Sequence, residues 1–117
     1  MVGFISLKEL QKFLQEKKGY VLIDVRDKEE LSYGMIPTAK HLSVYELQEA
    51  LQLNPEKFKA KYNFPKLGKQ ELIIFYCRTG HRSGMATAIA TQAGYTAKTY
   101  SGGVWEYSQI DPKVKRY

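Results

Sequence analysis

The sequence of 117 residues contains a single cysteine, Cys77. One cysteine cannot form an internal disulfide or a cysteine-based metal cluster, so we expect a reducing compartment such as the cytoplasm. The longest unbroken apolar run, from Leu72 to Cys77, is far too short to span a bilayer, and we expect no membrane association. The first ten residues lack the basic region and the long apolar stretch of a secretory signal, while a mitochondrial location stays open.

Linkers rich in proline and glycine, internal repeats and low-complexity segments are also missing from the sequence. We therefore expect one domain that covers residues 1–117. A chain of this size can bury about two-thirds of its unfolded surface, which is enough for an apolar core without disulfides.

The formal net charge of +6 favours small anions or acidic partners. The lysines are scattered along the chain rather than clustered in one stretch, so we expect no nucleic-acid partner. An ordinary solvated surface explains the charge equally well, and the charge alone therefore does not identify a function.

Helix-start and helix-stop signals recur along the chain. Ser6 and Glu9 form a capping box, and Gly19 can end the helix that follows. Further helices are expected to begin at Asp27 with Glu30 (ending at Gly34), at Ser43 with Glu46, at Asn54-Pro55, at Ser83 (ending near Ala93) and within the segment SGGVWEY.

Short apolar runs lie between these helices and predict buried strands at residues 20–25, 40–42, 71–76 and 96–100. Strands that alternate with helices imply a parallel sheet covered on both faces. Ligands on such sheets bind beyond the carboxyl ends of the strands. Cys77 follows directly on the run that is most typical of a strand, so it is expected at a ligand-binding edge.

The segment after this strand, CRTGHRS, has the residue types that stabilise an anionic sulfur. A free cysteine is mostly protonated at neutral pH, whereas the thiolate is the nucleophile. A helix that begins at Ser83 would offer an anion up to about 2 kcal/mol through its dipole and its free N–H groups. Arg78 and Arg82 would add positive charge nearby. We therefore interpret Cys77 as a nucleophile rather than as a buried structural thiol.

The remaining loop residues fit the same interpretation. Gly80 permits a tight turn in which successive N–H groups point inward, and Thr79 and Ser83 add hydroxyl donors. His81 has the chemistry of a general base, but a loop histidine more often is a surface group or donates to the backbone. His41 lies in a predicted strand, where a structural role is expected.

Three segments resemble the family signatures of single-domain rhodaneses, which are thiosulfate sulfurtransferases. LIDVRDKEELSYGMIPTAKHL is similar to the N-terminal signature, FYCRTGHRS to the active-site loop and GYTAKTYSGGVW to the closing segment. The stretch LSVYELQEALQLNPEKFKAKY is most similar to the small thiosulfate:glutathione sulfurtransferases. Met35 and Thr38 depart from the commoner histidine and glycine of the first signature, and both lie outside the cysteine loop.

The resemblance implies a fold, a reaction and partners. The fold is an α/β, rhodanese-like, five-stranded and mostly parallel sheet with helices on both faces. In the reaction, Cys77 takes the outer sulfur of thiosulfate as a persulfide and passes it to glutathione, thioredoxin, cyanide or a protein thiol, with ping-pong kinetics. Residues 78–83 would bind the substrate. The cycle needs no metal and no organic cofactor, and we expect a monomer.

Three residues outside the loop are candidates for supporting roles. Asp24 and Arg26 would orient the cysteine loop from the neighbouring strand, or would form an internal ion pair that holds the chain after that strand, which we favour. Trp105 follows the last predicted strand and would form either one wall of the pocket or part of the core.

Two other functions use similar sequence features. Cysteine phosphatases and arsenate reductases also place a cysteine and an arginine on a strand-to-helix loop, but with five residues between them, and here only four separate Cys77 from Arg82. The shorter nest fits a single sulfur atom better than a tetrahedral oxyanion. A rhodanese-like binding module without chemistry would be expected to lack the cysteine or the basic loop residues, which this sequence has.

Overall fold

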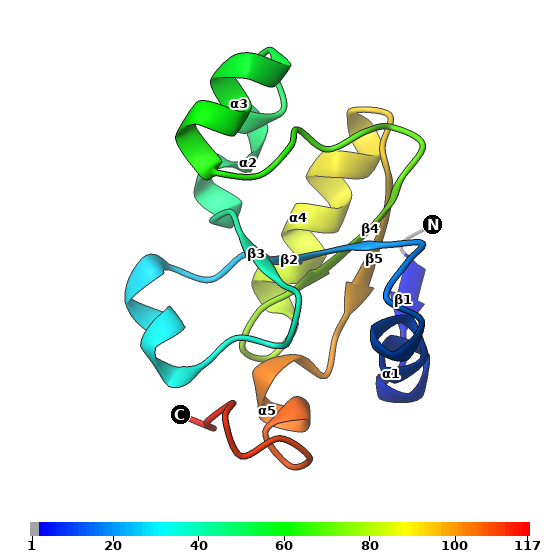
Figure 1. The fold of residues 1–117 in the computed structure, drawn as a ribbon, viewed down its shortest axis with the longest axis vertical. Helices are drawn as coiled ribbons and strands as arrows, with labels where there is room; N and C mark the ends of the chain where they lie inside the picture. Colours follow the sequence, from blue (N-terminus) through cyan, green and yellow to red (C-terminus); the bar gives the residue numbers. More distant parts are fainter. Residues whose placement is uncertain (1–2) are drawn as a thin grey trace.

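Five parallel strands form the centre of the computed structural model, which describes residues 3–117 (Figure 1). The strands are β1 (Gly3–Ile5), β2 (Val21–Asp24), β3 (Lys40–His41), β4 (Leu72–Tyr76) and β5 (Thr96–Tyr100). Their order in the sheet is β1-β5-β4-β2-β3. Every strand pair is parallel, so the expected five-stranded sheet is present, and it is wholly rather than mostly parallel.

The central strand β4 has neighbours on both sides and is covered on both faces. Its last four residues, Ile73 to Tyr76, are fully buried. Ile23 of β2 lies opposite Phe75, and Asp24 lies opposite Tyr76. This register brings the chain after Asp24 and the chain after Tyr76 to the same edge of the sheet.

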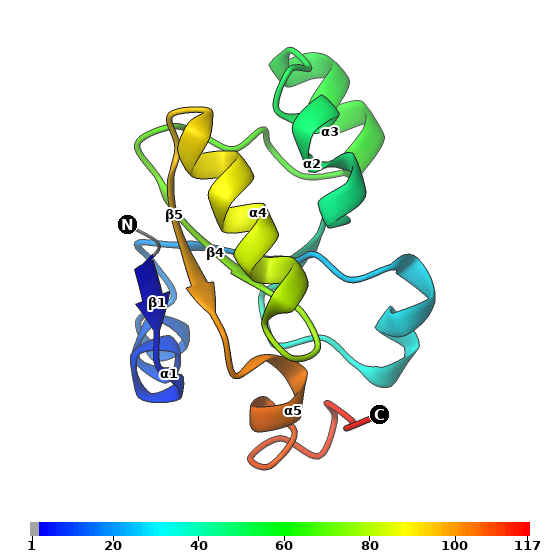
Figure 2. The same cartoon turned by 180° about the vertical axis from the view of Figure 1, so that it is seen from behind.

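Two layers of helices cover the sheet and enclose separate apolar cores. The helices are α1 (Leu7–Glu16), α2 (Val44–Ala50), α3 (Pro55–Tyr62), α4 (His81–Gln92) and α5 (Gly103–Tyr107), with the 3₁₀ helix η1 (Lys28–Tyr33) between β2 and β3. One core packs α2, α3 and α4 against the sheet, and the other packs α1 and α5 (Figures 1 and 2). No helix within residues 3–117 has both the length and the apolar character that a membrane span requires.

Most of the predicted helix starts are confirmed. The capping box of Ser6 and Glu9 opens α1, but α1 ends at Glu16 with Lys17 as its C-cap, two residues before Gly19. The segment that begins at Asp27 is a helix as expected, but of the 3₁₀ type.

Two helix starts differ in detail from the prediction. Ser43 caps α2 by accepting from Tyr45 N, but Glu46 makes no reciprocal bond, because its carboxylate accepts from the Tyr62 hydroxyl at 3.0 Å. Helix α4 begins at His81, two residues before the predicted start at Ser83. The earlier start moves the end of the helix dipole closer to Cys77.

Strand β1 was not predicted from the sequence. It has three residues, too few for an alternating pattern, and Phe4 at its centre is 62% exposed. Gly3 pairs with Lys98 and Ile5 with Tyr100, so the segment is a strand only because β5 lies beside it.

Candidate active site

Cys77 lies in the turn between the central strand and the start of α4. Its side chain is only 1% exposed. Gly80 precedes the first residue of α4 and has a φ of +103°, a conformation that favours glycine. The tight turn directs the first N–H groups of α4 back toward the end of β4, where the sulfur lies.

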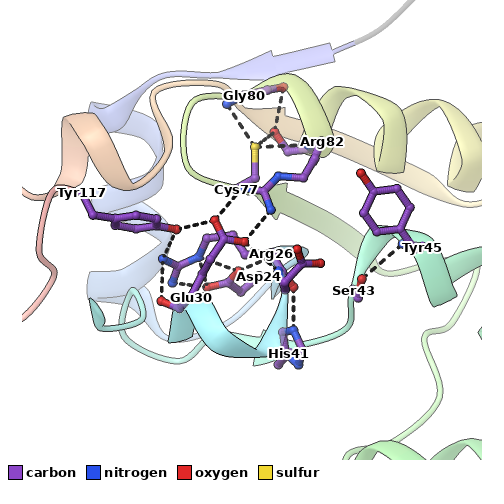
Figure 3. Close-up of polar contacts among 12 residues, drawn as sticks. Asp24, Arg26, Glu30, His41, Ser43, Tyr45, Cys77, Gly80, Arg82 and Tyr117 are labelled. Carbon is purple, nitrogen blue, oxygen red and sulfur yellow. Dashed lines mark hydrogen bonds and ion pairs between the residues drawn. The ribbon is translucent and has the colours of Figure 1, made fainter. Parts of the chain in front are cut away.

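Two backbone N–H groups converge on the Cys77 sulfur (Figure 3). Gly80 N lies 3.1 Å and Ser83 N lies 3.4 Å from Sγ. The thiol is within reach of the Ser83 hydroxyl at 3.6 Å, and that hydroxyl in turn donates to Gly80 O at 3.1 Å. Because unpaired N–H groups at a helix start carry partial positive charge, this arrangement favours a sulfur anion.

The turn between β5 and α5 packs directly on the cysteine loop. Val104 N donates to Cys77 O at 3.0 Å, and Trp105 N donates to Arg78 O at 3.2 Å. A Cβ atom added at Gly103 would lie 2.5 Å from Cys77 O, so only glycine permits this approach. The loop carbonyls are thereby held by α5, which leaves the N–H groups free to face the sulfur.

Arg82 forms an ion pair with Glu30 of η1. Its two terminal nitrogens lie 2.5 and 2.9 Å from the Glu30 carboxylate oxygens. The hydrogen bonds from Arg82 lower the pKa of Glu30 from 4.5 to about 2, and the same bonds raise the pKa of Arg82. The positive charge of Arg82, which we expected to stabilise the thiolate, is therefore partly neutralised by the carboxylate of Glu30.

Arg78 faces the C-terminal segment. Its guanidinium carbon lies 5.3 Å from the Trp105 ring and 4.7 Å from the Tyr117 ring, and Nη2 donates to the backbone oxygen of Tyr117. Trp105 is 38% exposed and belongs to neither apolar core, so core packing is excluded for it. Trp105 lies instead beside the active-site loop, against Arg78.

Asp24 and Arg26 form the internal ion pair that we favoured. Both side chains are fully buried, and three bonds of 2.7 to 3.1 Å join the guanidinium to the carboxylate. Burial opposes the charge of Arg26, but the bonds to Asp24 outweigh it and raise the pKa of Arg26. Arg26 also donates to the carbonyls of Glu30 and Gly34, so the pair holds the middle of η1 and the residue that follows it.

Sequence reasoning missed the part that Glu30 and Tyr117 have at this site. The Tyr117 hydroxyl donates to Glu30 at 2.8 Å and accepts from Arg26 at 2.9 Å, and its ring stacks on Tyr33 at 4.1 Å (Figure 3). Glu30 showed only a helix-cap signal, and Tyr117 showed none. Together they link the buried pair beneath the loop to Arg82 in the first turn of α4.

The other predicted loop residues differ in their exposure to solvent. Thr79 and His81 are exposed, whereas Ser83 is fully buried with its hydroxyl close to the sulfur. His41 contacts Arg26 O through Nε2 at 2.7 Å, which agrees with the structural role expected for it. No group of three or more histidine, cysteine or acidic side chains within residues 3–117 could hold a metal ion.

Two hollows in the surface differ in their relation to Cys77. One of about 370 Å³ lies at the amino ends of β2 and β4, the end of the sheet opposite the cysteine, with Val21, Leu22 and Phe64 among its lining residues. The other, of about 250 Å³, is lined by Trp105 and lies beside the loop. None of residues 77–83 lines either hollow, and the second adjoins the loop through Trp105, whose backbone N–H donates to Arg78 O.

Comparisons with known proteins agree with this geometry. The family model for the rhodanese-like domain matches residues 6–109. Thiosulfate:glutathione sulfurtransferase from Homo sapiens is 41% identical over 106 residues, which cover 88% of this chain and 90% of that protein. A rhodanese domain-containing protein from Drosophila melanogaster is 44% identical over 90 residues, covering 75% and 81% of the two chains. The solved structure of a human single-domain sulfurtransferase superposes with a TM-score of 0.89 at 35% identity, covering 95% of this chain and 99% of that one.

Proposed function

Because the chain belongs to the rhodanese-like domain family, we propose that it is a thiosulfate sulfurtransferase with Cys77 as the sulfur carrier. The observation that supports this most directly is the convergence of Gly80 N and Ser83 N on the sulfur of the single cysteine. Backbone donors at a helix start can stabilise first a thiolate and then a terminal persulfide anion in the same place.

In the first half-reaction, the Cys77 thiolate attacks the outer sulfur of thiosulfate. A new S–S bond forms, the S–S bond within thiosulfate breaks, and sulfite leaves with that electron pair. The thiol proton goes to solvent before the attack. The outer sulfur of the resulting persulfide carries the negative charge, and the N–H groups of Gly80 and Ser83 can donate to it.

In the second half-reaction, an acceptor thiol attacks the outer sulfur of the persulfide. The acceptor leaves as its own persulfide, and Cys77 returns as a thiolate. Cyanide as the acceptor would leave as thiocyanate. Both halves balance without an external oxidant, a metal or an organic cofactor, and a covalent intermediate between two substrates gives ping-pong kinetics.

In this scheme, each of residues 78–83 either binds substrate or holds the loop in place. Ser83 supplies an N–H donor and a hydroxyl, Gly80 supplies an N–H donor, and Arg82 fixes the start of α4 through Glu30. We infer that Arg78, Thr79 and His81 contact substrate, and that Asp24 and Arg26 hold the chain beside the loop while Trp105 lies against Arg78. The protein would act as a monomer of one domain, residues 1–117, in the cytoplasm or another reducing compartment.

Intact-protein mass spectrometry tests the central intermediate. Excess thiosulfate without any thiol is expected to add one sulfur atom per chain at Cys77, because no second cysteine can discharge it. Glutathione or reduced thioredoxin should then remove that sulfur in a single turnover. An unchanged mass in freshly reduced protein would contradict the proposal and would favour a binding module without chemistry.

A further inference from the structure

Two donors beside the cysteine loop converge on one oxygen atom. Arg78 Nη2 and Trp105 Nε1 both donate to the backbone oxygen of Tyr117, the indole bond being 3.0 Å long. A guanidinium and an indole N–H directed at a single point form a site for an oxygen that carries negative charge. In this structure the backbone oxygen of Tyr117, the last residue of the sequence, stands in for such an oxygen.

Arg78 has further capacity to bind an anion. Its Nε is buried and has no hydrogen-bond partner among residues 3–117, and its one hydrogen bond is the bond to Tyr117. By contrast, both terminal nitrogens of Arg82 are bonded to Glu30. Among residues 3–117, Arg78 is therefore the loop arginine whose guanidinium bonds no acidic side chain, and it adjoins Cys77 in the chain.

The position of this donor pair separates it from the sulfur. The groups that contact Sγ are the N–H groups of Gly80 and Ser83 and the Ser83 hydroxyl, whereas the Arg78 guanidinium lies against the rings of Trp105 and Tyr117. A group bound there belongs to a molecule that extends beyond the loop. Thiosulfate has one sulfonate directly on the reacting sulfur, whereas a thiol acceptor can have a carboxylate several bonds from its sulfur.

The neighbouring surface can receive the body of such a molecule. The hollow of about 250 Å³ beside Trp105 is lined by Gly102, Trp105, Glu106, Gln109 and Arg116. The Arg116 guanidinium lies 4.1 Å from the Trp105 ring, so a second cation borders the hollow. The Glu106 carboxylate accepts from the Tyr100 hydroxyl at 2.7 Å.

We propose that Arg78 and Trp105 form a carboxylate site for the acceptor thiol, and that the acceptor displaces the backbone oxygen of Tyr117 when it binds. The proposal rests on the proposed sulfurtransferase function and adds the class of acceptor: a small thiol with a carboxylate. The site selects that acceptor over neutral thiols. Trp105 contributes through its N–H, and its ring supports the Arg78 guanidinium.

The test compares glutathione with its glycine monoethyl ester as acceptors in steady-state turnover. Blocking the carboxylate should raise KM roughly tenfold for the wild type, because the two donors lose a charged partner. Trp105→Phe keeps the ring and removes the N–H. In this variant KM for glutathione should rise roughly fivefold, KM for the ester should change little, and kcat should stay within about twofold.

Lys115→Gln is the matched control, because it removes an exposed cation of the same C-terminal segment that neither lines the hollow nor contacts the Trp105 ring. Its ratio of KM values for ester and free acid should equal that of the wild type. Equal ratios in the wild type and in Trp105→Phe would overturn the proposal.

Two half-reactions distinguish the possible failures. Sulfur loading from thiosulfate, followed by mass, should proceed at the wild-type rate in Trp105→Phe. A loading rate that falls while the ester ratio is unchanged would assign the donor pair to the thiosulfate sulfonate and overturn the acceptor site. Absence of loading in the wild type would contradict the proposed function itself, whereas loading and discharge to cyanide without discrimination between the two thiols would contradict only this inference.

Discussion

The guanidinium of Arg82 and the carboxylate of Glu30 are joined by two hydrogen bonds of 2.5 and 2.9 Å. The contact ties the first turn of α4, which faces the Cys77 sulfur, to the 3₁₀ helix between β2 and β3. Arg82 therefore has two effects on the site. Arg82 supplies positive charge near the thiol, and it anchors the loop. Glu30 reduces the effect of the positive charge, because it is a carboxylate, and it provides the partner through which Arg82 anchors the loop.

Removing the carboxylate while keeping the arginine separates these effects. Glu30→Gln should increase the alkylation rate of Cys77 by iodoacetamide at neutral pH about two- to fivefold, because an uncompensated Arg82 favours the thiolate more strongly. Arg82→Gln should decrease the rate by a similar factor. Glu29→Gln removes an exposed carboxylate one residue away and is the control. A decrease in Glu30→Gln would show that anchoring dominates.

The same ion pair makes stability depend on acid pH. Because the pKa of Glu30 in the folded protein is about 2, below its ordinary 4.5, the stabilisation is complete above pH 4.5 and is lost as the pH falls through about 2. The loss amounts to on the order of 2–3 kcal/mol. Thermal melts between pH 6 and 2 should show a steeper fall for the wild type than for Glu30→Gln, and parallel curves would contradict the assignment.

Cys77→Ser should abolish sulfur transfer and leave the fold intact, because it replaces one buried atom without opening a cavity. Loading from thiosulfate and turnover with glutathione would both disappear, and the far-UV spectrum should stay the same. Turnover retained by this variant would exclude the persulfide mechanism.

Two glycines four residues apart provide a matched pair of substitutions. Gly80→Ala places a Cβ 2.8 Å from Ser101 O at a φ of +103°, so it should destabilise the fold by about 1–3 kcal/mol and displace an N–H donor from the sulfur. Gly84→Ala meets no atom within 4 Å on α4 and should stabilise by up to about 1 kcal/mol. Urea unfolding and turnover should separate the two variants, with activity lost only in Gly80→Ala.

The buried pair of Asp24 and Arg26 should matter far more for stability than the exposed pair of Glu46 and Lys61. Asp24→Asn leaves a buried guanidinium without its counter-ion and should cost about 3–5 kcal/mol. Glu46→Gln breaks a pair whose side chains are about half exposed and should cost less than about 1 kcal/mol. Equal losses in urea unfolding would contradict the structural role of the buried pair.

The strand-to-helix geometry of the loop could be predicted because it depends on residues that are close in sequence. Cys77, Gly80 and Ser83 lie within one strand-to-helix turn, and strand and helix signals flank them. The strands at 20–25 and 71–76 were predicted for the same reason, since continuous apolar runs report burial on both faces. The start of α4 was placed two residues late because Gly80, rather than a side-chain cap, precedes the helix.

The side-chain contacts that hold the loop and change its charge could not be predicted, because they join segments that are distant in the sequence. Glu30 meets Arg82, and Tyr117 meets Arg26, only after the sheet has brought their elements together. The orientation of Arg78 toward Tyr117 likewise depends on the path of the C-terminal segment, for which the sequence carries no local signal. The pairing of Arg82 with Glu30, which partly neutralises the charge of the loop, was therefore not predicted.

The pairing of β1 with β5 has a consequence during synthesis. Strand β1 leaves the ribosome before the other strands of this sheet, yet its partner contains Lys98 to Tyr100. At about 5–20 residues per second, the first strand waits roughly 5–20 s for that partner. A nascent chain can therefore complete this sheet only after the residues up to Tyr100 have emerged, and until then the edge that contains Phe4 has no partner strand.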